Sequence, residues 1–194
     1  MKLKLCVGVL ALVLAGGCDH ETSGPRIGVY DNPQVGLVVV DAQRDFLGDE
    51  AGGLIAAVDS LIEGAPGLGV GVVYVRSEPG GELDPRLGGK HEPVFVKRRS
   101  DAFSNPDLDA YFRAHEIDHL VLVGARADAS IYYTALGATN RGYKAAVVGD
   151  AVAAATAPGR DALLEALRRR GVEIISGERV LAEWARRKKY LSSR

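Results

Sequence analysis

Six short apolar runs alternate along the chain with longer stretches in which apolar residues recur every three or four positions. The runs are rich in valine, leucine and isoleucine, which is typical of strands buried on both faces of a parallel sheet. They lie at 35–40, 70–75, 93–96, 119–123, 145–148 and 172–175. The stretches with helical spacing lie at 54–64, 105–112, 130–142, 160–170 and 178–189. This order predicts an α/β fold, in which a parallel sheet is covered by helices on both faces.

The central runs predict the core of that fold. The side chains expected to be fully buried are Val38, Val40, Val73, Leu120, Leu122 and Val147. The segment 77–92 is long and rich in glycine and proline. Because long irregular segments are uncommon in compact domains, it is expected to form a binding lid.

The first seventeen residues have the pattern of a targeting segment. Lys2 and Lys4 precede an apolar run at 5–14 that is too short to span a bilayer comfortably. The sequence Leu14-Ala-Gly-Gly-Cys18 then resembles a bacterial lipobox, in which the cysteine is acylated and becomes the new N-terminus. The alternative is an ordinary secretory signal that is cut nearby.

The lipobox interpretation divides the chain into three parts. Residues 1–17 are a lipoprotein-type signal peptide, 18–34 a polar tether with lipidated Cys18, and 35–194 the folded domain. Acyl chains on Cys18 would anchor this domain in a membrane of the bacterial cell envelope, on the periplasmic side.

Composition sets limits on the chemistry. The chain has 194 residues, of which 47% are hydrophobic, enough for one domain with a full core. A net charge of −1 and the lack of a long basic stripe give no nucleic-acid footprint. Cys6 and Cys18 are the two cysteines, so the folded domain has no disulfide, thiolate metal site or cysteine nucleophile.

Three polar side chains follow directly after predicted strands. Asp41 follows the first, Lys97 the third, and Ser130 opens the helix after the fourth. Taken singly, each has an ordinary explanation: a turn residue, a solvated lysine and a helix N-cap. Ligands of parallel sheets bind at the carboxyl ends of the strands. Together the three side chains therefore predict a nucleophile with a base and a charge partner.

Several blocks of the sequence resemble the isochorismatase-like cysteine hydrolases. They are Val38-Val-Val-Asp41-Ala-Gln43-Arg-Asp45-Phe46, Val94-Phe-Val-Lys97 with Asp101-Ala-Phe103, Leu120-Val-Leu-Val-Gly124 through Ser130-Ile, Thr134-Ala, and Asn140-Arg-Gly142-Tyr. The resemblance implies a three-layer α/β/α sandwich with a six-stranded parallel sheet. It also implies a catalytic triad at Asp41, Lys97 and position 130.

The resemblance implies further site features around the loop before Ser130. The family tends to have a non-proline cis peptide there, which would be Ala125–Arg126, and an oxyanion hole formed by N–H groups around Arg126 and Ser130. Phe46 and Tyr133 are expected to line the substrate pocket.

The side chain of Arg126 has two possible partners, and the loop before the third strand bears on metal binding. Arg126 either binds a substrate carboxylate or pairs with Asp128, and the pairing is the favoured expectation. Relatives that hydrolyse nicotinamide bind a metal through an Asp-x-His pair and further histidines. The corresponding loop here has His91 beside Glu92 and no such pair, so neither a metal nor another cofactor is expected.

The chain departs from the family at the nucleophile, where Ser130 replaces cysteine. A thiol with a pKa near ~8.5 forms a thiolate far more easily than a hydroxyl ionises, so serine needs general-base help. One hypothesis is a hydrolase that acts on a small amide, or less favourably on an isochorismate-like enol ether. The other is a catalytically silent relative that binds a small ligand or protein partner in the same cleft. The sequence leaves open whether the serine was introduced and whether the chain forms a homo-oligomer.

Overall fold

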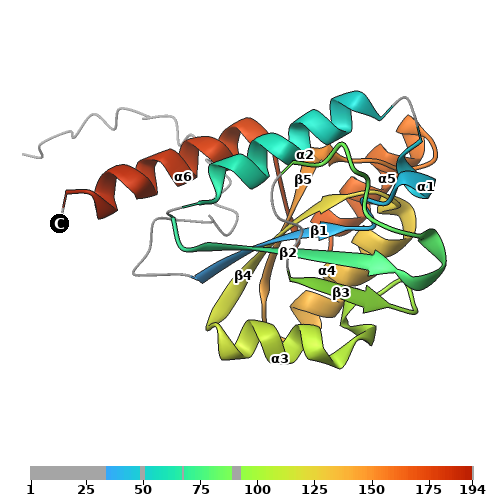
Figure 1. Cartoon of the computed structure of the whole chain (residues 1–194), viewed down its shortest axis with the longest axis horizontal. Helices are drawn as coiled ribbons and strands as arrows, with labels where there is room; N and C mark the ends of the chain where they lie inside the picture. Colours follow the sequence, from blue (N-terminus) through green and yellow to red (C-terminus); the bar gives the residue numbers. More distant parts are fainter. Residues whose placement is uncertain (1–33, 49–50, 67, 89–92, 194) are drawn as a thin grey trace, which may run out of the picture.

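A computed structural model describes residues 34–48, 51–66, 68–88 and 93–193 of the chain. The predicted signal peptide, Cys18 and the polar tether up to residue 33 lie outside the described residues. All six strands pair in parallel, in the order β3-β2-β1-β4-β5-β6 (Figure 1). The strands are β1 (Gln34–Val40), β2 (Val70–Ser77), β3 (Val94–Lys97), β4 (Ile117–Gly124), β5 (Lys144–Val152) and β6 (Glu173–Ile175).

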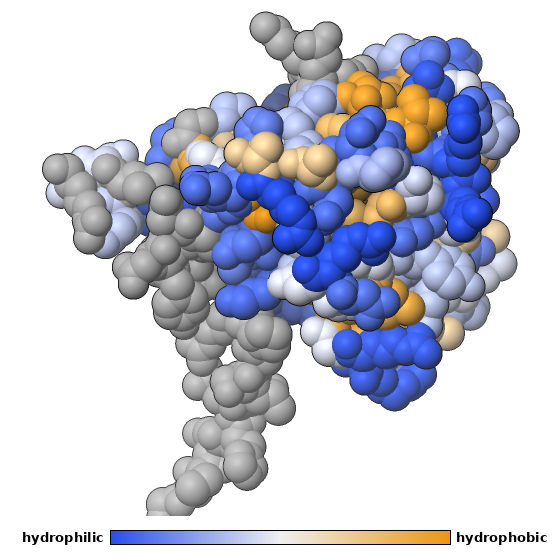
Figure 2. Space-filling model, turned by 90° about the horizontal axis from the view of Figure 1, so that it is seen from below, coloured by the Kyte–Doolittle hydropathy of each residue, from blue (hydrophilic) through white to orange (hydrophobic). Residues whose placement is uncertain are grey.

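Helices cover both faces of this sheet, so the predicted three-layer α/β sandwich is confirmed. The helices are α1 (Arg44–Leu47), α2 (Gly52–Gly64), α3 (Pro106–Ala114), α4 (Tyr132–Asn140), α5 (Ala157–Arg168) and α6 (Gly177–Leu191). In Figure 1, α2 and α6 lie above the sheet and α3 and α4 below it. The lower face is mainly hydrophilic on the outside, with small separate apolar groups (Figure 2).

Alternate residues of the central strands point into two separate cores, as strand geometry requires. Val38 and Val40 pack with α3, α4 and α5, whereas Leu37 and Val39 pack with α2 and α6. The six side chains predicted to be fully buried are each at most 1% exposed, which confirms the strand assignments. They are Val38, Val40, Val73, Leu120, Leu122 and Val147.

The helix after β4 starts earlier than the sequence indicates. A π-helical turn at Ala127–Ile131 precedes α4, and Arg126 in the left-handed region precedes that turn. The expectation that Ser130 opens the helix is therefore wrong, because the Arg126 carbonyl already accepts the N–H groups of Ala129 and Ser130. Ser130 lies inside the helical segment, and its hydroxyl does not cap the helix.

The strand order reverses between β1 and β4, and parallel sheets typically bind ligands at the carboxyl ends of the strands at such a point. Gly124 ends β4 with φ +124°, and a Cβ there would lie 2.0 Å from the Val40 carbonyl oxygen. Only glycine allows β4 to approach β1 so closely before the chain turns into the Ser130 loop. Among the described residues, no helix is both long and apolar enough to cross a bilayer.

Candidate active site

The three side chains predicted from the sequence meet where the strand order reverses. Ser130 Oγ donates a hydrogen bond to Asp41 Oδ2 over 2.5 Å, and Lys97 Nζ lies 3.0 Å from the same carboxylate oxygen. Lys97 Nζ also donates to Ser130 Oγ over 3.0 Å. A carboxylate after β1, an ammonium at the end of β3 and a hydroxyl in the helical turn after β4 are thus in mutual contact.

Ser77 is a fourth member of the site that the sequence reasoning missed. It ends β2, directly between β3 and β1, and pairs in register with Lys97. Its hydroxyl accepts from Lys97 Nζ over 2.9 Å and donates to Asp41 Oδ1 over 3.0 Å. The lysine side chain therefore reaches across β2 to the aspartate with Ser77 supporting both groups. Ser77 is a polar residue at the end of an apolar strand, and this pattern in the sequence could have indicated it.

Gln43 fixes the position of Ser77. Its side-chain oxygen accepts the Ser77 N–H over 2.7 Å, and its side-chain nitrogen donates to the Ser77 carbonyl over 2.9 Å and to the Gly81 carbonyl over 2.7 Å. Gln43 also forms an antiparallel bridge with Leu83. The described part of the expected lid, residues 77–88, is thereby held against the chain after β1.

The charged groups of the site are removed from water. Asp41 and Ser130 are 0% exposed and Lys97 is 1% exposed. Burial lowers the pKa of the Lys97 ammonium, and the neighbouring Asp41 carboxylate opposes this effect only in part. A buried ammonium with a lowered pKa releases its proton more readily than a surface lysine does.

Arg126 covers the site, and the favoured pairing with Asp128 is wrong. Its guanidinium lies over the Phe46 ring, 4.7 Å from the centroid, and 4.0 Å from Asp41 Oδ2. Arg126 has a left-handed backbone with φ +54°, and its side chain contacts Asp41 instead of Asp128. With its side chain 39% exposed, Arg126 is the cation of the site that solvent can reach.

The backbone donors expected for an oxyanion hole are not both available. The Ser130 N–H donates to the Arg126 carbonyl over 2.8 Å, because the helical segment already includes it. No hydrogen bond among the described residues uses the Arg126 N–H. The cis peptide at Ala125–Arg126 stays a prediction.

The two aromatic residues expected in the pocket differ in their surroundings. Phe46 stacks beneath Arg126 at the site and lies against Gly80, where a Cβ would come within 2.4 Å of its ring. Tyr133 is 52% exposed, and its ring contact is with Tyr132. A role for Tyr133 in substrate binding stays a prediction. The described residues contain no group of three histidine, cysteine or acidic side chains that could hold a metal ion.

The fold and the site together define a class: a parallel α/β sandwich with an aspartate, a lysine and a serine in contact where its strand order reverses. The isochorismatase domain family matches residues 35–179, which is most of the chain, and the chain therefore belongs to this family.

Solved structures share this fold at low sequence identity. An isochorismatase-like hydrolase from Alkaliphilus metalliredigens has a TM-score of 0.74 and 21% identity, covering 80% of this chain and 99% of its own. A cysteine hydrolase from Pseudomonas syringae has a TM-score of 0.73 and 18% identity, covering 79% of this chain and 93% of its own. A nicotinamidase from Staphylococcus aureus has a TM-score of 0.66 and 24% identity, covering 74% of this chain and 99% of its own. No curated protein matches the sequence.

Proposed function

We propose that the chain is a hydrolase of the isochorismatase family that cleaves a small amide, with Ser130 as its nucleophile. The observation that carries this proposal is the hydrogen bond of 2.5 Å from Ser130 Oγ to Asp41 Oδ2. This bond points the serine proton at a carboxylate, which is the arrangement that a hydroxyl nucleophile needs. The nicotinamidase among the structural neighbours favours an amide over an enol ether.

The contacts of the site suggest a role for each of its groups in the reaction. As Ser130 Oγ attacks the amide carbon, its proton passes to Asp41 and the carbonyl oxygen becomes an oxyanion near the Arg126 N–H. When the C–N bond breaks, the leaving nitrogen takes up that proton and departs as an amine. Water then attacks the acyl-serine and gives a proton to Asp41, the bond from the acyl carbon to Ser130 Oγ breaks, and Oγ takes up that proton as the acid is released. Lys97, held at 3.0 Å from Ser130 Oγ, stabilises the negative charge that develops on that oxygen.

Arg126 suggests what else the substrate carries. It is the partly exposed cation above the buried triad, and Phe46 supports its guanidinium from below. A guanidinium in a fixed orientation is well suited to a planar carboxylate. We therefore expect a small amide that also bears an anionic group.

A second function is favoured by a specific observation. Ser130 is fully buried, and its hydroxyl is engaged with both Asp41 and Lys97. Such a closed network is also what a catalytically silent relative would keep in order to stabilise its fold, while binding a ligand or protein partner above it.

One experiment separates the two functions. The protein is incubated with small amides and activated esters, and intact mass is used to find an acyl adduct. An adduct that forms on the wild type and on Ser104→Ala, a change at an exposed serine, but not on Ser130→Ala supports the hydrolase. No adduct and no turnover in the wild type overturn it. In that case, adduct formation by Ser130→Cys would show that the site is a silent relative's, intact apart from its nucleophile.

We also propose that the chain is lipid-anchored through Cys18 on the periplasmic side of the cell envelope. The lipobox-like sequence supports this proposal. Metabolic labelling with a fatty acid should mark the wild-type protein and leave Cys18→Ala unlabelled. Equal labelling of both proteins, or none, would contradict the proposal.

A further inference from the structure

The C-terminal part of α6 extends past the rest of the molecule. The last residue of α2, Gly64, packs against Leu181 and Trp184 of α6, where a Cβ on Gly64 would come within 2.6 Å of Leu181. Residues 185–193 lie beyond this contact, and Figure 1 shows α6 running out past the edge at which β1 and β2 begin. We call residues 185–193 the basic end.

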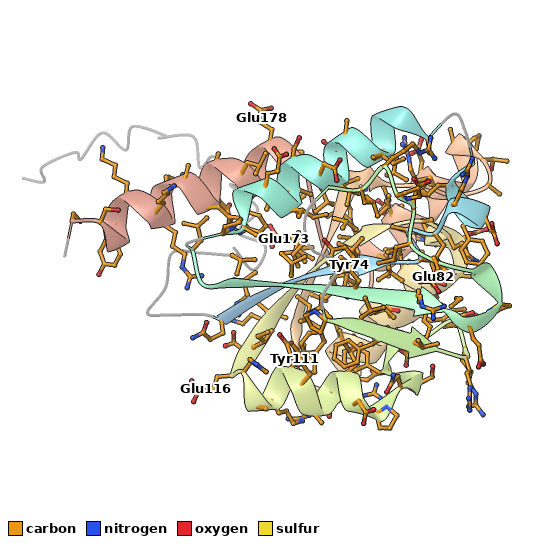
Figure 3. All side chains as sticks on the ribbon, viewed as in Figure 1. Tyr74, Glu82, Tyr111, Glu116, Glu173 and Glu178 are labelled. Carbon is orange, nitrogen blue, oxygen red and sulfur yellow. The ribbon has the colours of Figure 1, made fainter. Side chains whose placement is uncertain are left out.

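The basic end carries an excess of positive charge. It contains Arg186, Arg187, Lys188 and Lys189 and no acidic residue. Both lysines are exposed, and none of the ion pairs in the described part of the chain involves them. Glu178, the exposed acid of the same helix, lies near its start (Figure 3). Favourable interaction with the helix dipole explains cations in the last turn, but it does not require that turn to protrude.

The start of the folded domain lies beside the basic end. Gly69 is flanked by Arg187 and by Gln34, the first residue of β1, since a Cβ on Gly69 would lie 3.7 Å from Arg187 Nη2 and 3.8 Å from Gln34 Oε1. The first described residue, Gln34, therefore lies next to the basic end. The triad lies at the other edge of the sheet, where the strands finish.

We propose that the basic end is a docking surface for the anionic surface of a lipid bilayer, and that it turns the triad away from the membrane. Each basic group near an anionic membrane adds to binding, and a lipid anchor keeps the patch close to the surface. Tyr190, which is 43% exposed, adds an aromatic ring of the kind that settles at the membrane–water interface. The consequence is that the triad edge faces the aqueous phase, so a substrate would reach it from water. This last point rests on the proposed function, whereas the docking itself does not.

Overall charge cannot produce this binding. The full chain has a net charge of −1, and removal of residues 1–17 with Lys2 and Lys4 takes it to −3. An anionic surface repels such a molecule unless a local patch attracts it. Binding that depends on acidic lipid would therefore show that a local positive patch, and not the net charge, attracts the protein to the membrane.

The test uses the chain from residue 18 with Cys18→Ser, which retains every strand and helix described and has no thiol. Circular dichroism first checks that each variant is folded. Ser193→Cys introduces a single site for an environment-sensitive dye at the basic end. Tyr133→Cys places the same dye at the exposed start of α4, near the triad edge. Binding is measured to vesicles of phosphatidylcholine alone and of phosphatidylcholine with phosphatidylglycerol.

We expect binding to the mixed vesicles, and we expect high salt to abolish this binding. The emission of the dye should shift to the blue when it is at position 193 and stay unchanged when it is at position 133. Lys188→Glu/Lys189→Glu should weaken this binding by about tenfold or more. The matched control is Arg44→Glu/Arg98→Glu, an equal charge change at two exposed arginines of the triad edge, which should leave it within about twofold.

Three outcomes would overturn the proposal. They are no binding to the mixed vesicles, equal weakening by the two charge reversals, or equal shifts of the two dyes. If the lysine reversal instead abolished self-association without vesicles, measured by sedimentation, the basic end would be a surface for a second copy. No substrate is used, so failure here and failure of the proposed hydrolase activity are distinguishable.

Discussion

At the scale of single residues, the site is a buried ion pair whose polar atoms are all partnered. Lys97 Nζ is surrounded by Asp41 Oδ2, Ser77 Oγ, Ser130 Oγ and the Arg99 carbonyl oxygen. An ammonium has three hydrogens to donate, so four nearby acceptors satisfy it fully. A charge can remain inside a protein only under such conditions.

Lys97→Met should therefore destabilise the protein by about 3–5 kcal/mol, because the buried Asp41 carboxylate would lose its close ammonium partner and keep only the more distant Arg126 guanidinium. Denaturant unfolding measures the change. Adding Asp41→Asn to Lys97→Met should recover most of the loss, since the remaining carboxamide is neutral. Arg98→Met, at a side chain that is 81% exposed, is the control and should stay within about 0.5 kcal/mol of wild type. An unchanged stability for Lys97→Met would show that the ion pair is not formed.

At the scale of elements, close packing around α4 holds the loop that follows Lys97. Asp101 caps the 3₁₀ turn Ala102–Ser104, and Thr134 of α4 accepts the Ala102 N–H over 3.0 Å. Gly137, one turn further along α4, leaves room for the Asp101 carboxylate. Burial raises the pKa of that carboxyl group above its usual range, and the Phe103 N–H and Arg141 oppose this shift.

Gly137→Ala should destabilise the protein by about 1–3 kcal/mol, although alanine normally favours a helix. The reason is that a Cβ on Gly137 would lie 2.6 Å from Asp101 Oδ1. Gly53→Ala in α2 is the matched control: nothing lies within 4 Å of its Cβ position, so this change should stabilise by about 0.4–1 kcal/mol. Thermal unfolding compares the two. The same sign of effect at both glycines would contradict the packing argument.

At the scale of the whole molecule, polar contacts tie the layers together at the edge opposite the triad. The hydroxyl of Tyr143, just before β5, donates to Asp109 Oδ1 of α3 over 2.6 Å. Arg113 of α3 pairs with the other oxygen of that carboxylate over 2.9 Å. Burial and the hydrogen bond to Asp109 together raise the pKa of Tyr143 to about 12.

This raised pKa predicts how stability varies with alkaline pH. An unfolded tyrosine ionises near ~10, so between that pH and about 12 the unfolded state binds fewer protons than the folded state. The contribution of Tyr143 is thus complete below the unfolded pKa and is lost as pH rises through the folded pKa. Denaturant unfolding at a series of pH values should show this loss in the wild type and a smaller one in Tyr143→Phe. Parallel curves for the two proteins would exclude this role of Tyr143.

The sequence by itself determined the sandwich, because burial on both faces of a parallel sheet leaves continuous apolar runs that local pattern reveals. Val38, Val40, Leu120 and Leu122 were assigned to the core from that pattern alone, and all are buried. The positions of Asp41 and Lys97 after strand ends likewise indicated where polar groups would gather.

Only the tertiary structure decided how those groups are connected. Ser77 joins the site because β2 lies between β3 and β1, a neighbour relation that no local pattern contains. Arg126 contacts Asp41 and Phe46, which are distant from it in the sequence, from a backbone in the left-handed region. Ser130 lies inside a helical turn because the Arg126 carbonyl has bound its N–H. Hydrogen bonds between distant segments depend on register and backbone angles, which are fixed only when the whole chain packs.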